Sequence, residues 1–130
     1  MHSIVTIFLL ASLAVSVILG AEVRYPTKYD NIELDSILGN ERLYKQYFNC
    51  LMNKGKCTAE AKFLKETVPD ALATGCSKCS QKQRNGMFKV MKFMIQKKRG
   101  DFNKLAAIYD PQGAYRNKFA AEAKKHGINL

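Results

Sequence analysis

The sequence has few of the residue types from which catalytic centres are usually built. It contains 2 histidines in 130 residues, and only His126 remains once residues 1–20 are set aside. It shows no glycine-rich phosphate loop, no nucleophile elbow and no pair of metal-ligating residues on one helical face. Its acidic residues fall mostly at expected helix caps and exposed faces, where solubility and helix-dipole roles suffice. We therefore expect no enzymatic activity, no metal and no cofactor.

Charged side chains are absent from residues 1–20, of which 14 are hydrophobic. The apolar run from Ile4 to Leu19 ends at the small residues Gly20 and Ala21, which is typical of a secretory signal peptide. The alternative is a membrane anchor, but this run of 16 residues is short for a span, and no basic residue follows at once. We expect a signal peptide over residues 1–20, cleavage near 20/21, and a secreted, extracellular protein without stable membrane insertion.

Strand-like alternation of apolar and polar residues is also missing, as are internal repeats and low-complexity tracts. After residue 28, apolar residues recur instead with helical spacing nearly throughout the chain. A length of 130 residues rules out multidomain enzyme architectures. We therefore expect residues 21–130 to form a single all-α domain, a compact bundle of about six short helices.

Capping residues mark where several helices should begin. Asn40, Thr58 and Ser80 are suitable N-caps, and Ser80 with Gln83 has the spacing of a capping box. The residues before them, 22–28, look like an extended arm. Helical spacing of the apolar residues predicts the first four helices. They are expected over residues 31–38 and 41–53, after Thr58, and from Ser80 to about residue 98.

Breaking residues mark where helices should stop. Pro69 is expected to kink or break the helix that follows Thr58, near Val68. Gly100-Asp101 is expected to end the longest helix and to cap a short one over residues 102–109. Residues 110–113 have the composition of a turn, and a last helix should follow them.

Positive charge outweighs negative charge, with 21 Lys+Arg against 11 Asp+Glu and a formal net charge of +10. Residues 22–77 hold eight residues of each sign, whereas residues 78–126 hold thirteen basic and three acidic residues. Such a surface can attract nucleic acid, anionic membranes or acidic headgroups, but a secretory leader argues against nucleic acid. A solvated face that keeps the protein soluble explains the charge at least as well.

Four cysteines follow the spacing C-x6-C-x18-C-x2-C, at Cys50, Cys57, Cys76 and Cys79. Four cysteines allow three pairings. Pairing of neighbours would close two short rings at predicted helix boundaries, each removing roughly 2 kcal/mol of loop entropy. A four-cysteine zinc site and a redox pair at Cys76 and Cys79 are the alternatives. The six-residue gap and the lack of a strand–helix unit disfavour them.

Several short motifs accompany the cysteines over essentially all of residues 21–130. They are Thr27-Lys28-Tyr29-Asp30-Asn31, Asn49-Cys50-Leu51, Lys54-Gly55-Lys56-Cys57-Thr58, Val68-Pro69-Asp70-Ala71-Leu72, Cys76-Ser77-Lys78-Cys79 with Lys82-Gln83, and Tyr109-Asp110-Pro111. With these motifs, and with four cysteines rather than the six usual for odorant-binding proteins, the sequence resembles the insect chemosensory proteins. The resemblance implies six helices around an apolar channel, disulfides Cys50–Cys57 and Cys76–Cys79, and binding of long-chain or aromatic volatiles without catalysis.

Tryptophan is absent from the chain, although members of that family commonly carry one near the start of the fifth helix, at the channel. Phe102 occupies the matching position. It keeps an aromatic wall but lacks the indole N–H and some of the volume. Gly100 also differs from the more helical residues expected just before it. We therefore expect a roomier or less polar channel at this point.

The residues that the resemblance favours for the channel are also good core residues, because apolar side chains at helical spacing serve both purposes. Met87, Met91 and Met94 are unbranched and polarizable, which suits a cavity that reshapes around varied chains. The alternative is that they fill gaps in the core. The predicted ligand-binding residues are Tyr47, Leu64, Val68, Met87, Val90, Met91, Met94 and Phe102.

The sequence as a whole predicts a secreted, monomeric carrier of small hydrophobic molecules in chemosensory transport. Long-chain alcohols, esters, fatty acids and other semiochemicals are the expected ligands, and no nucleic-acid partner is expected. The basic second half suggests one alternative, a cationic membrane-active or immune-type protein. A secreted developmental factor is another, because one scaffold can be reused for several functions.

Overall fold

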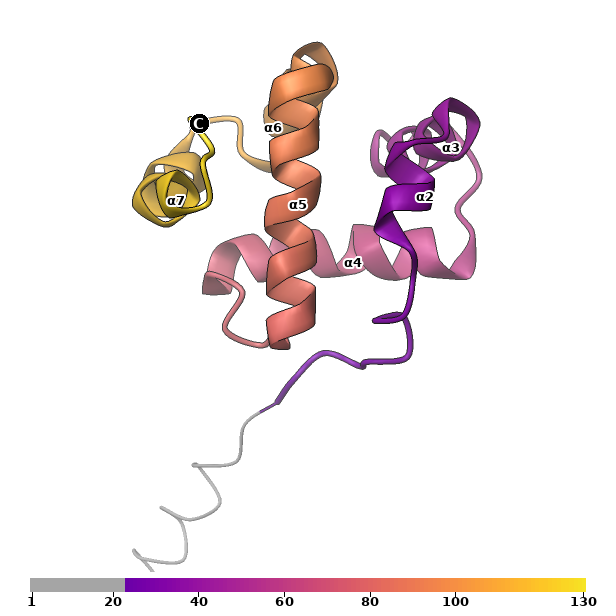
Figure 1. Ribbon diagram of the computed structural model, residues 1–130, viewed down its shortest axis with the longest axis horizontal. Coiled ribbons are helices and arrows are strands. Elements are labelled where there is room, and N and C mark those ends of the chain that lie inside the picture. The colour runs from indigo at the N-terminus through magenta and orange to yellow at the C-terminus, as the bar shows by residue number, and fades with distance from the viewer. Residues whose placement is uncertain (1–22) are drawn as a thin grey trace, which may run out of the picture.

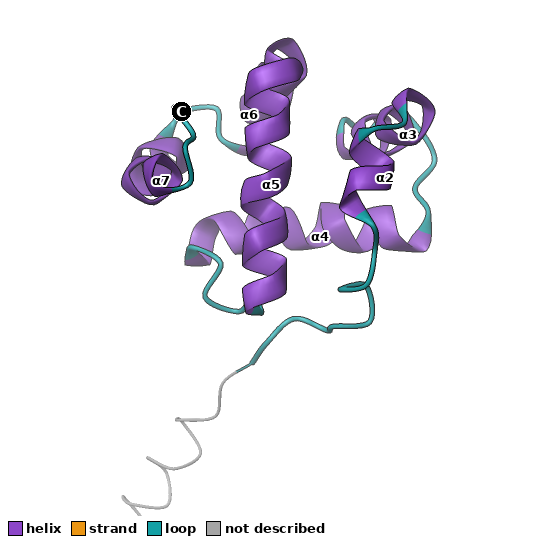
Figure 2. Ribbon diagram, viewed as in Figure 1, coloured by secondary structure: helices purple, strands orange, loops and turns teal. Residues whose placement is uncertain are grey.

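The computed structural model describes residues 23–130, so the expected signal peptide and its cleavage point lie outside the described residues. Across residues 23–130 the backbone forms six α-helices and no strand, as the sequence predicts (Figure 2). The helices are α2 (Leu34–Leu38), α3 (Glu41–Leu51), α4 (Ala59–Thr74), α5 (Gln81–Lys97), α6 (Arg99–Tyr109) and α7 (Ala114–Lys125).

Three helices begin at the side chains predicted to cap them. The side-chain oxygen of Asn40 accepts hydrogen bonds from two backbone N–H groups in the first turn of α3. Thr58 does the same for one N–H group of α4, and Ser80 with Gln83 forms the capping box of α5. These side chains satisfy backbone donors that the start of a helix leaves unpaired.

Pro69 does not break α4, so of the kink or break predicted near Val68 the break is wrong. The helix continues to Thr74 and ends at Gly75, which takes the left-handed φ of 65° that glycine accommodates without strain. A proline inside a helix removes one backbone donor and crowds the carbonyl four residues earlier. Because Pro69 is exposed and helical residues flank it on both sides, α4 tolerates this local loss.

The boundary between α5 and α6 lies earlier than the sequence predicts. Gly100 and Asp101 do not separate two helices but lie in the first turn of α6, which begins at Arg99. Lys98, with a φ of −137°, is the only residue between α5 and α6. The first N–H groups of a helix need no partner within it. A side chain at Gly100 would meet no atom within 4 Å, so glycine there neither relieves crowding nor ends the helix.

The helices cross at steep angles instead of lying parallel. In Figure 1, α4 runs across the molecule and α5 passes over it in the view, while α3 and α7 lie on opposite sides and are seen nearly end-on. Helix α2 packs against α3 and α5, α3 packs against α4, and α5 packs against α6. Short helices at such angles meet over limited contact areas, which leaves interior space between them.

Two disulfides join neighbouring cysteines along the chain. Cys50–Cys57 connects the last turn of α3 to the residue before the N-cap of α4, and Cys76–Cys79 closes the loop between α4 and α5. Each disulfide therefore holds the junction of two consecutive helices. Because all four cysteines are paired, no cysteine thiolate remains for a zinc site.

A small buried cluster joins α5, α7 and the tail that follows α7. Phe88, Ala123 and Ile128 are its buried members, each no more than 3 % exposed. Partly buried apolar residues pack against the cluster, namely Met87, Met91, Ile95 and Leu130. The ring of His126 stacks on Phe88 with ring centroids 4.0 Å apart. These contacts hold the last residues of the chain against α5.

Candidate ligand-binding site

A cavity of about 450 Å³ lies between the helices, and every helix from α2 to α7 contributes to its wall. The structure brings all of the predicted ligand-binding residues to this one cavity. They are Tyr47 from α3, Leu64 and Val68 from α4, Met87, Val90, Met91 and Met94 from α5, and Phe102 from α6. Their common location shows that the apolar faces of four helices converge on one space.

Helix α5 supplies the largest share of these residues: Met87, Val90, Met91 and Met94. Steps of three and four residues place them on one face of the helix. Met94 is buried, whereas the other three are partly exposed, as wall residues of a cavity are. The three thioether side chains can change rotamer at low cost, so this wall can adapt to ligands of different shape.

Phe102 lies in the first turn of α6 and contributes an aromatic ring to the wall. Leu64 lines the cavity from α4 and is 39 % exposed. An exposed leucine that also lines the cavity marks a place where the wall is thin and solvent is near. Met94, at 6 % exposure, belongs instead to the deep part of the wall.

Tyrosine hydroxyls in the wall have partners within the protein. Tyr44 Oη donates a hydrogen bond to Asp101 Oδ2 at 2.9 Å, and Tyr109 Oη donates to the carbonyl oxygen of Leu51 at 2.8 Å. The first bond joins α3 to α6, and the second joins α6 to the end of α3. Because these hydroxyls are satisfied, the two rings present mainly apolar surface to the cavity.

Three tyrosines in the wall, Tyr44, Tyr47 and Tyr109, stay neutral over a wide pH range. Burial raises the pKa of Tyr44, and the hydrogen bond to Asp101 raises it further. Burial also raises the pKa of Tyr109, and burial together with the nearby Glu60 carboxylate raises that of Tyr47. No phenolate charge therefore enters the cavity wall at neutral pH.

The arm before α2 is held against the junction of α4 and α5. The backbone N–H of Tyr25 donates to the carbonyl oxygen of Lys78 at 3.0 Å, and its hydroxyl donates to Asp70. Gln83 Nε2 donates to the carbonyl oxygen of Pro26 at 3.0 Å. Burial, together with the bond to Asp70, raises the pKa of Tyr25 to about 12. Tyr25 also lines the cavity, so the arm forms part of its wall.

A charged pair, Asp110 and Arg116, lies at the cavity edge where the turn enters α7. Asp110 is 6 % exposed, and its carboxylate accepts hydrogen bonds from the backbone N–H groups of Tyr115 and Arg116. It also pairs with the Arg116 guanidinium at 3.0 Å. This carboxylate therefore caps α7, and its charge is neutralised within the protein.

The wall also contains residues that the sequence patterns assigned only to helix faces or to no site. Leu34 and Ile37 come from the short helix α2, Ile32 lies just before it, and Phe119 comes from α7. Leu130, in the tail, had no sequence signal at all. An apolar run in a short helix does not distinguish a core face from a cavity face, so pattern reasoning could not select these residues.

Residues 23–130 contain no group of three or more His, Cys, Asp or Glu side chains placed to hold a metal ion. No helix within that range combines the length and the apolar character needed to cross a bilayer.

A family model described as the insect pheromone-binding family A10/OS-D matches residues 25–117. The chain belongs to this family. Ejaculatory bulb-specific protein 3 of Drosophila melanogaster is 46 % identical to this OS-D chain over 114 residues, which cover 88 % of this chain and 90 % of that relative.

Solved structures show the same likeness of the OS-D chain to chemosensory proteins. A chemosensory protein in complex with bromo-dodecanol is 43 % identical, with a TM-score of 0.72, and the match covers 76 % of this chain and 99 % of that one. The antennal chemosensory protein A6 from the moth Mamestra brassicae is 44 % identical with a TM-score of 0.66, covering 82 % and 98 % of the two chains. The predicted family and six-helix fold are therefore confirmed.

Proposed function

We propose that this OS-D protein carries a small hydrophobic molecule in its interhelical cavity and releases it chemically unchanged. The observation that carries the proposal is the cavity of about 450 Å³, walled by methionine, aliphatic and aromatic side chains. Small-molecule pockets commonly measure about 300 to 1,000 Å³ and are mostly apolar. The eight wall residues predicted from the sequence are the proposed ligand contacts.

Apolar contact supplies most of the affinity that such a carrier needs. A ligand that hides roughly 300 Å² of apolar surface gains about 7 kcal/mol. A dissociation constant of about 1 µM corresponds to about 8 kcal/mol, and lost ligand freedom subtracts from the gain. Binding weaker than 1 µM therefore follows from about 300 Å² of apolar contact without a polar anchor, and tighter binding needs a larger buried area. Weak binding of this kind permits release.

Long-chain alcohols are the first ligands to test, because a similar structure was solved with bromo-dodecanol. Esters, fatty acids and other semiochemicals share the long apolar chain that the cavity accepts, so chemosensory transport is the proposed role. The uncharged, apolar residues 1–20 support secretion into an extracellular fluid. In that fluid we propose that the protein acts as a monomer.

Competition with a fluorescent apolar probe tests the proposal. N-phenyl-1-naphthylamine should bind the wild-type protein, and 1-dodecanol should displace it at tens of micromolar or less. Val90→Phe places extra volume in the cavity wall and should weaken both ligands at least tenfold. Lys104→Phe introduces the same side chain at an exposed site on α6 and should leave both affinities unchanged.

Two results would contradict the carrier proposal. One is a folded wild-type protein, with normal far-UV circular dichroism, from which no long-chain alcohol, ester or fatty acid displaces the probe. The other is equal weakening by Val90→Phe and Lys104→Phe, which would place the ligand outside the cavity.

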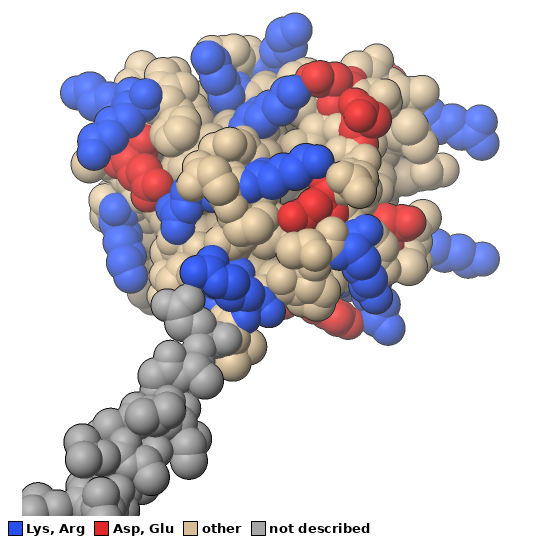
Figure 3. Space-filling view, turned by 60° about the horizontal axis from the view of Figure 1, so that its bottom comes forward, with Lys and Arg blue, Asp and Glu red and all other residues tan. Residues whose placement is uncertain are grey.

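The surface charge gives the membrane-active alternative less support. Figure 3 shows one face of the molecule, on which Lys and Arg side chains are distributed with acidic side chains among them. Lys89 and Lys98 form ion pairs with Asp35 and Glu41. A carrier should therefore cause no leakage of vesicles made from anionic lipid, whereas a membrane-active protein would cause leakage that high salt suppresses.

A further inference from the structure

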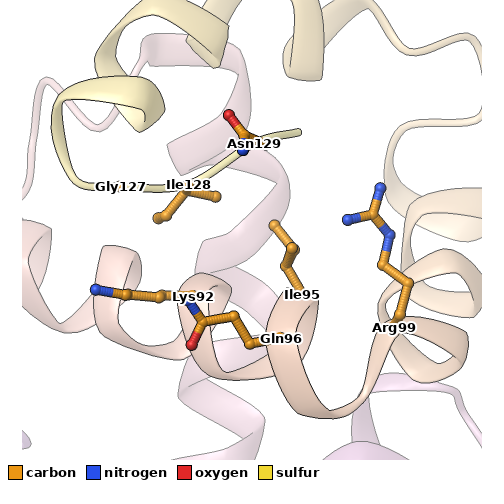
Figure 4. A pocket seen from close by; sticks show the side chains of 7 residues that line it. All are labelled: Lys92, Ile95, Gln96, Arg99, Gly127, Ile128 and Asn129. Atoms are coloured by element: carbon orange, nitrogen blue, oxygen red, sulfur yellow. The ribbon is translucent and has the colours of Figure 1, made fainter.

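A second, smaller cleft lies at the far end of α5, outside the cavity described above. It has a volume of about 260 Å³ and is formed by the last turns of α5, the start of α6 and the tail after α7 (Figure 4). The residues that line it are Lys92, Ile95, Gln96, Arg99, Gly127, Ile128 and Asn129. None of them is a predicted ligand-binding residue, and none of them lines the larger cavity.

The outer wall of this cleft is a tail with a defined backbone. Gly127 takes a left-handed φ of 75°, which favours glycine and reverses the chain at the end of α7. The N–H groups of Gly127 and Ile128 donate to the carbonyl oxygens of Lys124 and Ala123 at 3.0 Å each. The side chain of Ile128 is then buried at 2 % exposure. The cleft is therefore a formed feature of the fold.

Two cationic side chains in the cleft have no acidic partner. Lys92 and Arg99 lie at opposite ends of it in Figure 4. No acidic residue lines the cleft, and no ion pair within 4.0 Å involves either side chain in the part of the chain that the structure describes. Their charges are available to a ligand.

The acidic residues of the second half are all engaged elsewhere. Asp101 accepts the hydroxyl of Tyr44, Asp110 pairs with Arg116, and Glu122 pairs with Arg84 at 2.9 Å. No acidic side chain of the second half is therefore left to balance the positive charges of Lys92 and Arg99 at this cleft.

Two isoleucine side chains lie in the middle of the cleft. The side chains of Ile95 and Ile128 lie between the two cations in Figure 4, and the amide side chains of Gln96 and Asn129 lie at its edge. Lys92 comes from the last turns of α5 and Arg99 from the first turn of α6, on either side of the break at Lys98. The order of cation, apolar floor and cation matches a small molecule that carries an anion at each end of a short apolar chain.

We propose that this cleft binds small α,ω-dicarboxylates, with one carboxylate on the Lys92 ammonium and the other on the Arg99 guanidinium. Arginine holds a carboxylate through two parallel N–H donors, and lysine acts as a mobile point charge. The chain between the carboxylates lies on Ile95, with the buried Ile128 beneath it. The apolar interhelical cavity excludes such a dianion, because burying unpaired carboxylates is costly. The cleft therefore binds independently of the carrier cavity.

Calorimetric titration with three six-carbon compounds tests the proposal at low ionic strength. Adipate carries two carboxylates, hexanoate carries one, and 1,6-hexanediol carries none. Because each solvent-exposed ion pair is worth up to about 1 kcal/mol, adipate should bind about fivefold more tightly than hexanoate. The diol should show no saturable binding, and inorganic phosphate should bind more weakly than adipate because it makes no contact with the isoleucines.

Matched variants assign the site. Lys92→Ala and Arg99→Ala should each lower adipate affinity about fivefold, to the level of hexanoate. Lys92→Arg should retain it, and Lys104→Ala, which removes an exposed charge outside the cleft, should leave it unchanged. In ¹H–¹⁵N spectra, adipate should shift the amide signals of Gly127 and Asn129.

Several outcomes would overturn the proposal. They are an absence of adipate binding, equal affinities for adipate and hexanoate, and equal effects of Lys92→Ala and Lys104→Ala. Amide shifts confined to the wall of the larger cavity would also overturn it. Displacement of the fluorescent apolar probe is a separate measurement, so failure of the dicarboxylate site and failure of the carrier function can be told apart.

Discussion

At the scale of single residues, Asp110 shows how a charged side chain can be placed inside a small helical protein. Burial alone would raise the pKa of its carboxyl. Hydrogen bonds from the backbone N–H groups of Arg116 and Tyr115, together with the Arg116 guanidinium, outweigh burial and hold the pKa below its usual value. The carboxylate thereby caps α7 and stabilises its connection to α6.

Asp110→Ala should lower the free energy of unfolding by about 2 kcal/mol at neutral pH, because α7 loses its cap and Arg116 loses its partner. Since the folded-state pKa is depressed, this contribution is present at neutral pH and is lost as pH falls through the folded-state value. The difference between wild type and variant, measured by urea unfolding, should therefore shrink below about pH 4. Asp35→Ala, which removes an exposed ion pair, should change stability by less than about 0.5 kcal/mol. Equal losses in the two variants would contradict the capping role.

Tyr44 gives the opposite pH dependence. Because burial and Asp101 raise its folded-state pKa, the stability from its neutral hydroxyl is complete below the ordinary tyrosine pKa of about 10. It is lost as pH rises above that value. Tyr44→Phe removes the bond to Asp101 and should cost about 1.5 kcal/mol at neutral pH. The gap between wild type and variant should narrow in urea unfolding between about pH 9 and pH 11. A gap that stays constant over this range would argue against a raised pKa.

At the scale of elements, side chains that act on the neighbouring backbone were readable from the sequence, and the effects of breakers were not. Asn40, Thr58 and Ser80 cap the helices that follow them because a cap needs only the next few residues. Whether a helix tolerates Pro69 depends on how the fold holds the helical turns on both sides of it, which local sequence does not contain. The same holds for Gly100, which lies inside α6.

Pro69→Ala should raise the free energy of unfolding by about 1 to 3 kcal/mol. The variant restores a backbone N–H that can bond four residues back in α4 and removes the crowding by the ring. Because Pro69 is exposed, little packing is lost. Thermal and urea unfolding both report the change. A decrease in stability would mean that the proline ring makes a contact that α4 needs.

The disulfide Cys50–Cys57 should stabilise the protein modestly. Its ring is short, so loss of the bond in a Cys50→Ser/Cys57→Ser double variant should cost roughly 2 kcal/mol of unfolding free energy. Far-UV circular dichroism should still show the helices, because the disulfide holds a junction rather than a distant contact. Peptide mapping of the wild type should find Cys50 joined to Cys57 and Cys76 to Cys79. Any crossed pair in the native protein would contradict this arrangement.

At the scale of the whole molecule, the charge and the cavity are separate features. The formal net charge of +10 lies on the exterior, whereas tyrosine hydroxyls in the cavity wall are neutral and bonded to the protein. The affinity for a neutral alcohol in the cavity should therefore change less than about twofold between about 0.02 and 0.5 M salt. Probe displacement at each ionic strength measures it. A steep loss with salt would show that the alcohol binds on the charged surface.

The residues named from the sequence for the ligand site all line one cavity, because helical periodicity and the family resemblance together select the inward faces of α3 to α6. Periodicity identifies the apolar faces of the helices, and the resemblance indicated which of these faces line the channel. Ile32 and Leu130 were not selected, since the segment before α2 and the C-terminal tail carry too little periodicity to show which way their side chains face. Binding measurements on variants of Ile32 and Leu130 will decide whether these two residues contact a ligand.

Length, helical periodicity and caps by themselves determined an all-helical chain and the starts of α3, α4 and α5. The cysteine spacing and its accompanying motifs indicated the family. These features depend on residues close together in the chain, where backbone geometry and capping act directly. Only the tertiary structure decided that α4 continues past Pro69, which side chains from distant segments line the cavity, and that Lys92 and Arg99 remain unpaired across a second cleft. Those outcomes depend on contacts between distant segments, and the sequence pattern does not state the angles at which the helices meet.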